Sequence, residues 1–156
     1  MAKAVIVTLA DEVAAELTAK SGGWAESFEA ERKYQPKLDF EDTDMLHVQV
    51  FPAATRNIGA DSRASWLHEY DIDVLIHYRA SAKAASQATE KFDNLQLLVE
   101  QIGDHYKTRR ATVSDCYLST SSVGADSGLP YIHSAIETQN QFVSGVRLTF
   151  RKSRST

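Results

Sequence analysis

The sequence predicts an α+β domain in which a mainly antiparallel sheet carries two helices on one face. Apolar and polar residues alternate in five segments, which is typical of strands with one buried face. Two other segments repeat apolar residues every three or four positions, which is typical of amphipathic helices. The resulting order is α-β-β-β-α-β-β. Because the strands come in runs, antiparallel pairing is favoured over a doubly wound parallel sheet.

The first predicted helix is short. Leu9, Val13 and Leu17 recur at steps of four and form one apolar stripe. Thr8 and Asp11 have the spacing of a capping box, which places the start of the helix near Thr8.

Three strands are predicted next, over residues 27–34, 45–51 and 66–79. An acidic connection, 39–44, joins the first two. Residues 52–65 are small and polar and predict a long loop, a kind of segment that is usually functional or disordered. The third strand is the longest, so we expect it to project beyond the body of the sheet.

The second predicted helix has the clearest pattern in the chain. Its apolar residues recur at steps of 4, 3, 4, 3 and 4, which predicts a helix lying across the sheet. They are Ala88, Phe92, Leu95, Val99, Ile102 and Tyr106. Strands over 113–123 and 141–151, joined by a second long loop that includes 124–134, complete the fold.

Size and charge narrow the class of protein. With 156 residues, 43% of them hydrophobic and 24% charged, the chain predicts one domain covering 1–156. The 17 basic and 21 acidic residues give a net charge of -4, which argues against a general phosphate-binding surface. Apolar runs are too short for a membrane span or a signal peptide, so we expect a cytoplasmic protein that does not enter a membrane.

Catalytic and metal-binding motifs are not evident. No glycine-rich phosphate loop or standard nucleophile motif occurs, and the five histidines lack helical metal-binding spacing. His68 and His77 are nine residues apart on one strand, so their side chains point to opposite faces. Asp115, Cys116 and His133 could form a nucleophile set, but the more economical interpretation of Cys116 is a buried thiol. We therefore expect no enzyme activity, no cofactor and no metal.

An acidic row is the main candidate site. Glu69, Asp71 and Asp73 share one face of the long strand, which allows catalytic carboxylates in principle but favours a solvated or cross-strand-paired row. Basic residues recur at the same period in the last strand, so the row could pair within the chain or with a neighbouring subunit. Trp24 and Trp66 are each either half-buried packing residues or interface anchors. The hypothetical subunit interface comprises Glu69, Asp71, Asp73, Arg147, Arg151 and Trp66.

Four short phrases, in order along most of the chain, resemble the small minor-tail and tail-terminator proteins of tailed bacteriophages. They are Glu31-Arg32-Lys33-Tyr34-Gln35-Pro36, Leu38-Asp39-Phe40-Glu41-Asp42, Leu46-His47-Val48 and Leu148-Thr149-Phe150-Arg151.

The resemblance implies a structural virion protein at the head-proximal end of the tail, assembled in the host cytoplasm. It implies a homo-oligomeric ring, hexameric by expectation, that caps the tail-tube protein, ends tube growth and offers a surface to the head-tail connector protein. DNA would pass through the ring without sequence-specific binding. The alternatives are a head-completion or neck protein of the same virion, a small-ligand or peptide-binding α+β module, and an uncharacterised hydrolase.

Overall fold

The computed structural model describes residues 2–20, 23–35, 43–81, 88–108, 115–123 and 141–155. They form two helices and a five-stranded sheet in the predicted order α-β-β-β-α-β-β, which confirms the α+β class. The elements are α1 (Val5–Ala19), β1 (Ala30–Arg32), β2 (Leu46–Ser62), β3 (Ser65–Arg79), α2 (Ala88–Thr108), β4 (Tyr117–Val123) and β5 (Gln141–Ser155).

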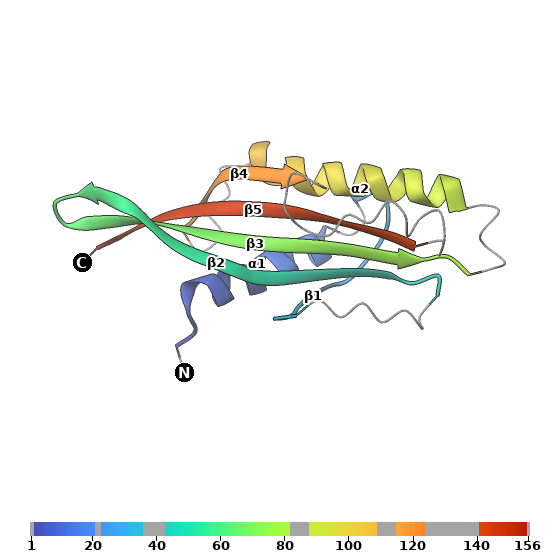
Figure 1. The fold of residues 1–156 in the computed structure, drawn as a ribbon, viewed down its shortest axis with the longest axis horizontal. Coiled ribbons are helices and arrows are strands. Elements are labelled where there is room, and N and C mark those ends of the chain that lie inside the picture. The colour runs from blue at the N-terminus through green and yellow to red at the C-terminus, as the bar shows by residue number, and fades with distance from the viewer. Residues whose placement is uncertain are drawn as a thin grey trace.

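The sheet is mixed but mostly antiparallel, with strand order β1-β2-β3-β5-β4. Only the short β1 runs parallel to its neighbour, β2. The central strand, β3, pairs with β5 without a register shift from Ser65 opposite Ser155 to Arg79 opposite Gln141. Figure 1 shows these long strands running almost the whole length of the molecule.

Both helices pack on one face of this sheet and enclose the main core. Alternate residues of β3 point towards the helices, among them Ile72, Val74 and Ile76, which are fully buried. The apolar stripes of α1 and α2 pack against them. These stripes are formed by Leu9, Val13 and Leu17 and by Leu95, Leu98, Val99, Ile102 and Tyr106. The stripe predicted for the second helix is therefore confirmed.

The opposite face of β3 is buried too. Leu75 lies between Phe51 of β2 and Val143 of β5 in a second, smaller cluster. Since successive strand residues point to opposite faces, burial of every residue from Tyr70 to Tyr78 means that this stretch is enclosed on both sides.

A close approach between α2 and β4 requires glycine. A Cβ atom at Gly103 would lie 2.7 Å from Cγ2 of Val123, which is closer than carbon atoms normally approach. The side chain of Val123 is branched and stiff, so it cannot easily move aside.

The predicted loop over 52–65 is wrong. β2 and β3 continue into a two-residue turn at Arg63 and Ala64, and the resulting hairpin projects past the helices (Figure 1). The residues there are mostly exposed, so burial no longer imposes an apolar alternation although strand pairing continues. Register shifts in β2 further disturb the pattern. We call residues 53–69, together with residues 151–155 of β5, the arm.

Other predicted boundaries also need correction. α1 begins at Val5 after the N-cap residue Ala4, and the hydroxyl of Thr8 donates to the Ala4 carbonyl from inside the first turn. Thr8 therefore does not cap the helix. The strand predicted over 27–34 is reduced to β1, and Tyr34 is 68% exposed. Most of the acidic connection and the loop over 124–134 lie outside the described residues.

Candidate functional site

The predicted acidic row lies at the base of the arm, where three strands bring opposite charges together. Strand register places Glu69 opposite Arg151, Asp71 opposite Thr149 and Asp73 opposite Arg147. β2 adds a third arginine, Arg56, opposite Glu69 on the other side of β3. We call this set of side chains the ionic ladder: Arg56, Glu69, Asp71, Asp73, Arg147, Thr149 and Arg151.

Two arginines bridge the middle of the ladder. Arg147 donates to both carboxylate oxygens of Asp73, with Nε–Oδ1 and Nη2–Oδ2 distances of 2.8 and 2.9 Å. Arg56 donates to Asp71 from Nη1 and Nη2 at 2.6 and 2.8 Å, and also reaches Glu69 Oε1 from Nη2 at 2.6 Å. Such fork-shaped contacts fix the geometry of a carboxylate as well as its charge.

Two further hydrogen bonds connect the ladder residues of β3 to β5. Arg151 Nε donates to Glu69 Oε2 at 3.0 Å, and the Thr149 hydroxyl donates to Asp71 Oδ1 at 2.9 Å. Glu69 and Asp71 therefore each bind donors from both neighbouring strands.

Burial and charge act in opposite directions on these carboxylates. Burial by itself raises the pKa of Asp71, but the hydrogen bonds from Arg56 and Thr149 outweigh it and the net pKa is lowered. The hydrogen bonds from Arg56 lower the pKa of Glu69 most strongly. Burial opposes them, the bond from Arg151 lowers the pKa further, and the net pKa is lowered. In turn, Asp71 and Glu69 raise the pKa of Arg56. Glu69, Asp71 and Arg56 are therefore ionised at neutral pH.

This arrangement establishes cross-strand pairing within the chain, which was one of the two interpretations of the row. The other, contact with a neighbouring subunit, stays a prediction. The sequence pattern does not point to Arg56, because Arg56 falls within the segment that the pattern predicts to be a loop. Trp66 lies farther out on the arm, opposite Arg154, and is 43% exposed.

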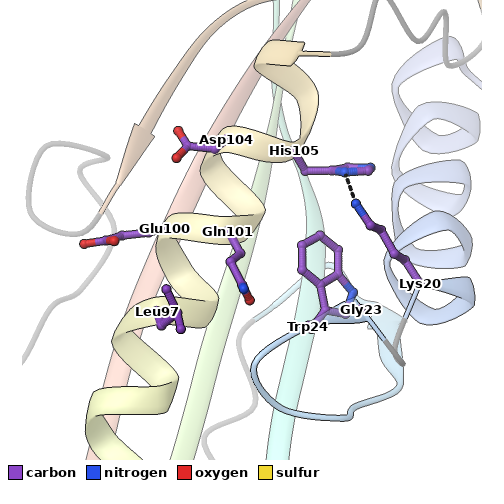
Figure 2. A pocket seen from close by; sticks show the side chains of 8 residues that line it. All are labelled: Lys20, Gly23, Trp24, Leu97, Glu100, Gln101, Asp104 and His105. Atoms are coloured by element: carbon purple, nitrogen blue, oxygen red, sulfur yellow. Dashed lines mark hydrogen bonds between the residues drawn. The ribbon is translucent and has the colours of Figure 1, made fainter.

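A second candidate feature is an open hollow of about 350 Å³ between α2 and the segment that follows α1. Figure 2 shows Trp24 and Lys20 on one side of it and the outer face of α2, with Leu97, Glu100 and Asp104, on the other. Trp24 is half-buried, and its indole N–H donates to the Leu17 carbonyl at 2.9 Å.

His105 anchors the floor of this hollow. Its Nε2 lies 2.8 Å from Oε1 of Glu16, and its Nδ1 lies 3.0 Å from Nζ of Lys20 (Figure 2). Trp24 meets the His105 ring edge-on at 5.4 Å between centroids. The Lys20 ammonium lies 5.0 Å from the Trp24 ring centroid, a cation–π distance. These contacts hold Trp24 and Lys20 against the helix.

Among the remaining candidate groups of the sequence, Cys116 and His77 are buried, Asp115 is exposed, and His133 lies outside the described residues. Within the described ranges, no three His, Cys, Asp or Glu side chains form a group that could hold a metal ion. Cys116 is fully buried, and burial raises the pKa of its thiol; the position of His133 is not among those described. His77 stacks on His47 across β2 and β3, and its pKa is lowered, chiefly by burial.

No family model and no curated protein sequence matches this chain. Neither described helix combines the length and the apolar character that crossing a membrane requires.

Proposed function

We propose that this chain is a structural virion protein whose subunits form a ring, six by expectation, on the end of a bacteriophage tail tube. The ring ends tube growth and provides the surface that joins the head-tail connector. The proposal combines the resemblance of the four sequence phrases with the shape of the subunit.

The observation that carries the proposal is the arm. It projects beyond the helix-covered body (Figure 1). It also exposes apolar side chains: Ile58 is 42% exposed and Trp66 is 43% exposed. Aromatic residues of this kind are common anchors of protein interfaces. A ring built head to tail needs a surface on each subunit that reaches a different surface of the next one, and a projecting arm supplies such a surface.

The ionic ladder supports the same role by stiffening the arm where it leaves the body. A two-stranded ribbon in water is only marginally stable by itself. Here β5 pairs with β3 as far as Ser65, next to the turn, so the arm has three strands. Arg56, Glu69 and Arg151 connect all three through side-chain contacts at its base. A pre-organised arm loses less conformational entropy when it binds than a mobile one.

The experiment is reconstitution with tail tubes. Purified protein is added to polymerising tail-tube protein, and tube lengths and tube ends are measured by electron microscopy, with light scattering of the protein alone. The proposal predicts rings at tube ends and an end to elongation. A protein that stays monomeric and leaves tube length uncontrolled contradicts it.

Two alternatives give different results in the same preparation. A neck protein binds the connector side and leaves free tube ends uncapped. A small-ligand module, favoured by the hollow beside Trp24, would carry a copurified ligand that native mass spectrometry detects, and would leave the tubes unchanged.

A further inference from the structure

The outer face of α2 carries a stripe of acidic residues with one apolar residue at its centre. Leu97 is 47% exposed and lies between Asp93 and Glu100, one helical turn away on either side. Glu90 and Asp104 extend the stripe at the same spacing. Asp104 binds Lys107, whereas Glu90, Asp93 and Glu100 form no ion pair with any described residue.

The arm has the complementary character. Its charged residues are Arg56, Asp61, Arg63, Glu69, Arg151, Lys152 and Arg154, so basic residues outnumber acidic ones by five to two. Arg63, at the turn, and Arg154, opposite Trp66, are exposed and form no ion pair with the described part of the chain. The end of the arm therefore presents free positive charge beside an exposed indole.

The shape of the arm favours docking through side chains over pairing through its edge. Beyond Pro52, the outer edge of β2 pairs with no described strand, but three register shifts interrupt it. Bulges of this kind protect edge strands from adding another strand.

We infer that the arm of one copy of this chain docks on α2 of a second copy, with Trp66 entering the hollow between Trp24 and Leu97. Arg63 and Arg154 then face the acidic stripe. Ligand pockets begin at about 300 Å³, so a hollow of about 350 Å³ is large enough for an indole ring. This inference rests on the proposed ring, because it names the two surfaces that join successive subunits. The two surfaces differ, so the contact is head to tail and can close into a ring.

Charge reversal on each surface tests the inference. In the arm variant, Arg63→Glu with Arg154→Glu, the end of the arm and the outer face of α2 are both acidic. In the helix variant, Asp93→Lys with Glu100→Lys, both surfaces are basic. Each variant alone should self-associate on the order of tenfold or more weakly than the wild type in sedimentation velocity, because like charges meet. An equimolar mixture should recover association, since alternating copies restore both contacts.

The control is Glu29→Lys with Glu31→Lys, which reverses two exposed acidic residues away from α2 and should leave association unchanged. Circular dichroism and melting temperatures establish that every variant is folded. Wild-type association should also weaken as salt rises.

The inference is overturned if the equimolar mixture associates no more strongly than the two variants do separately. It is also overturned if either variant associates like the wild type, or if the wild type stays monomeric at every concentration. If the charge-reversed variants still form rings that cap tubes, the contact is refuted and the proposed function stands. Mixture-restored association without tube capping would refute the function and leave the contact standing.

Discussion

The body of the sheet and the arm are built from the same strands but are stabilised differently. In the body, β3 is buried on both faces from Tyr70 to Tyr78, and its apolar side chains pack against both helices and a second cluster. In the arm, β2 is mostly exposed and β3 is mostly half-buried, and polar and ionic contacts replace apolar packing.

Because of this difference, folding stability and contacts with other chains should depend on different regions of the molecule. Burial of apolar surface is the largest favourable contribution to folding, so the body holds most of the stability of the chain. An arm that contributes little to folding can expose Trp66, Arg63 and Arg154 without weakening the body. The two regions should therefore respond differently to mutation.

The largest loss of stability is expected from the body. Phe150 is fully buried and meets the Tyr106 ring edge-on at 5.6 Å between centroids. Phe150→Ala removes this packing and leaves a cavity, so we expect the free energy of unfolding to fall by about 3–5 kcal/mol. Urea denaturation measures the loss. A change below about 1 kcal/mol would contradict the assignment of stability to the body.

A smaller loss is expected at the ionic ladder, between the two regions. Asp71→Ala removes two bonds from Arg56 and one from Thr149. Hydrogen bonds to charged groups contribute about 1.5–3 kcal/mol, but Arg56 is 44% exposed, so a loss of about 1–2 kcal/mol is expected. Asp61→Ala, at an exposed aspartate of the arm, is the matched control and should change stability by less than about 0.5 kcal/mol.

The ladder also predicts a dependence on pH. The pKa values of Glu69 and Asp71 are lowered from 4.5 and 3.8, so in acid the unfolded chain binds protons that the folded chain does not. These two carboxylates contribute fully to the free energy of unfolding above their ordinary pKa values. The contribution is lost as the pH falls through their lowered pKa values. The pKa of His77 is lowered from 6.5, so His77 adds a loss of the free energy of unfolding that begins near pH 6.5 as the pH falls.

Thermal unfolding measured from pH 7 downward checks this. Asp71→Ala should lose less stability than the wild type between about pH 5 and pH 2, because it lacks one of the two shifted carboxylates. Parallel curves for the two proteins would show that Asp71 does not carry the effect.

Sequence reasoning identified the elements that are buried and missed the ones that are not. The stripe from Ala88 to Tyr106 predicts α2 because every turn of that helix places a residue of the stripe against the core. The outer part of β2 gave no such signal, since exposed strand residues need not alternate. The acidic row was recognised from its period, but its partner Arg56 lay in the unrecognised strand. The hollow joins Lys20 to His105, 85 positions apart, and only tertiary structure brings them together.

The most direct test asks whether the body carries folding and the arm carries assembly, and it removes the outer hairpin of the arm. Arg56 and Glu69 face each other across β2 and β3, so residues 57–68 can be replaced by an Asn-Gly turn, which suits a two-residue hairpin. Ala64→Gly, which changes the native turn but keeps the arm, is the control.

Melting curves and sedimentation velocity are then measured on the same samples. We expect the free energy of unfolding of the shortened chain to lie within about 1 kcal/mol of the wild-type value, because most of the removed residues are exposed. We also expect the shortened chain to stay monomeric where the control assembles. A shortened chain that fails to fold, or that assembles as the control does, would contradict the account.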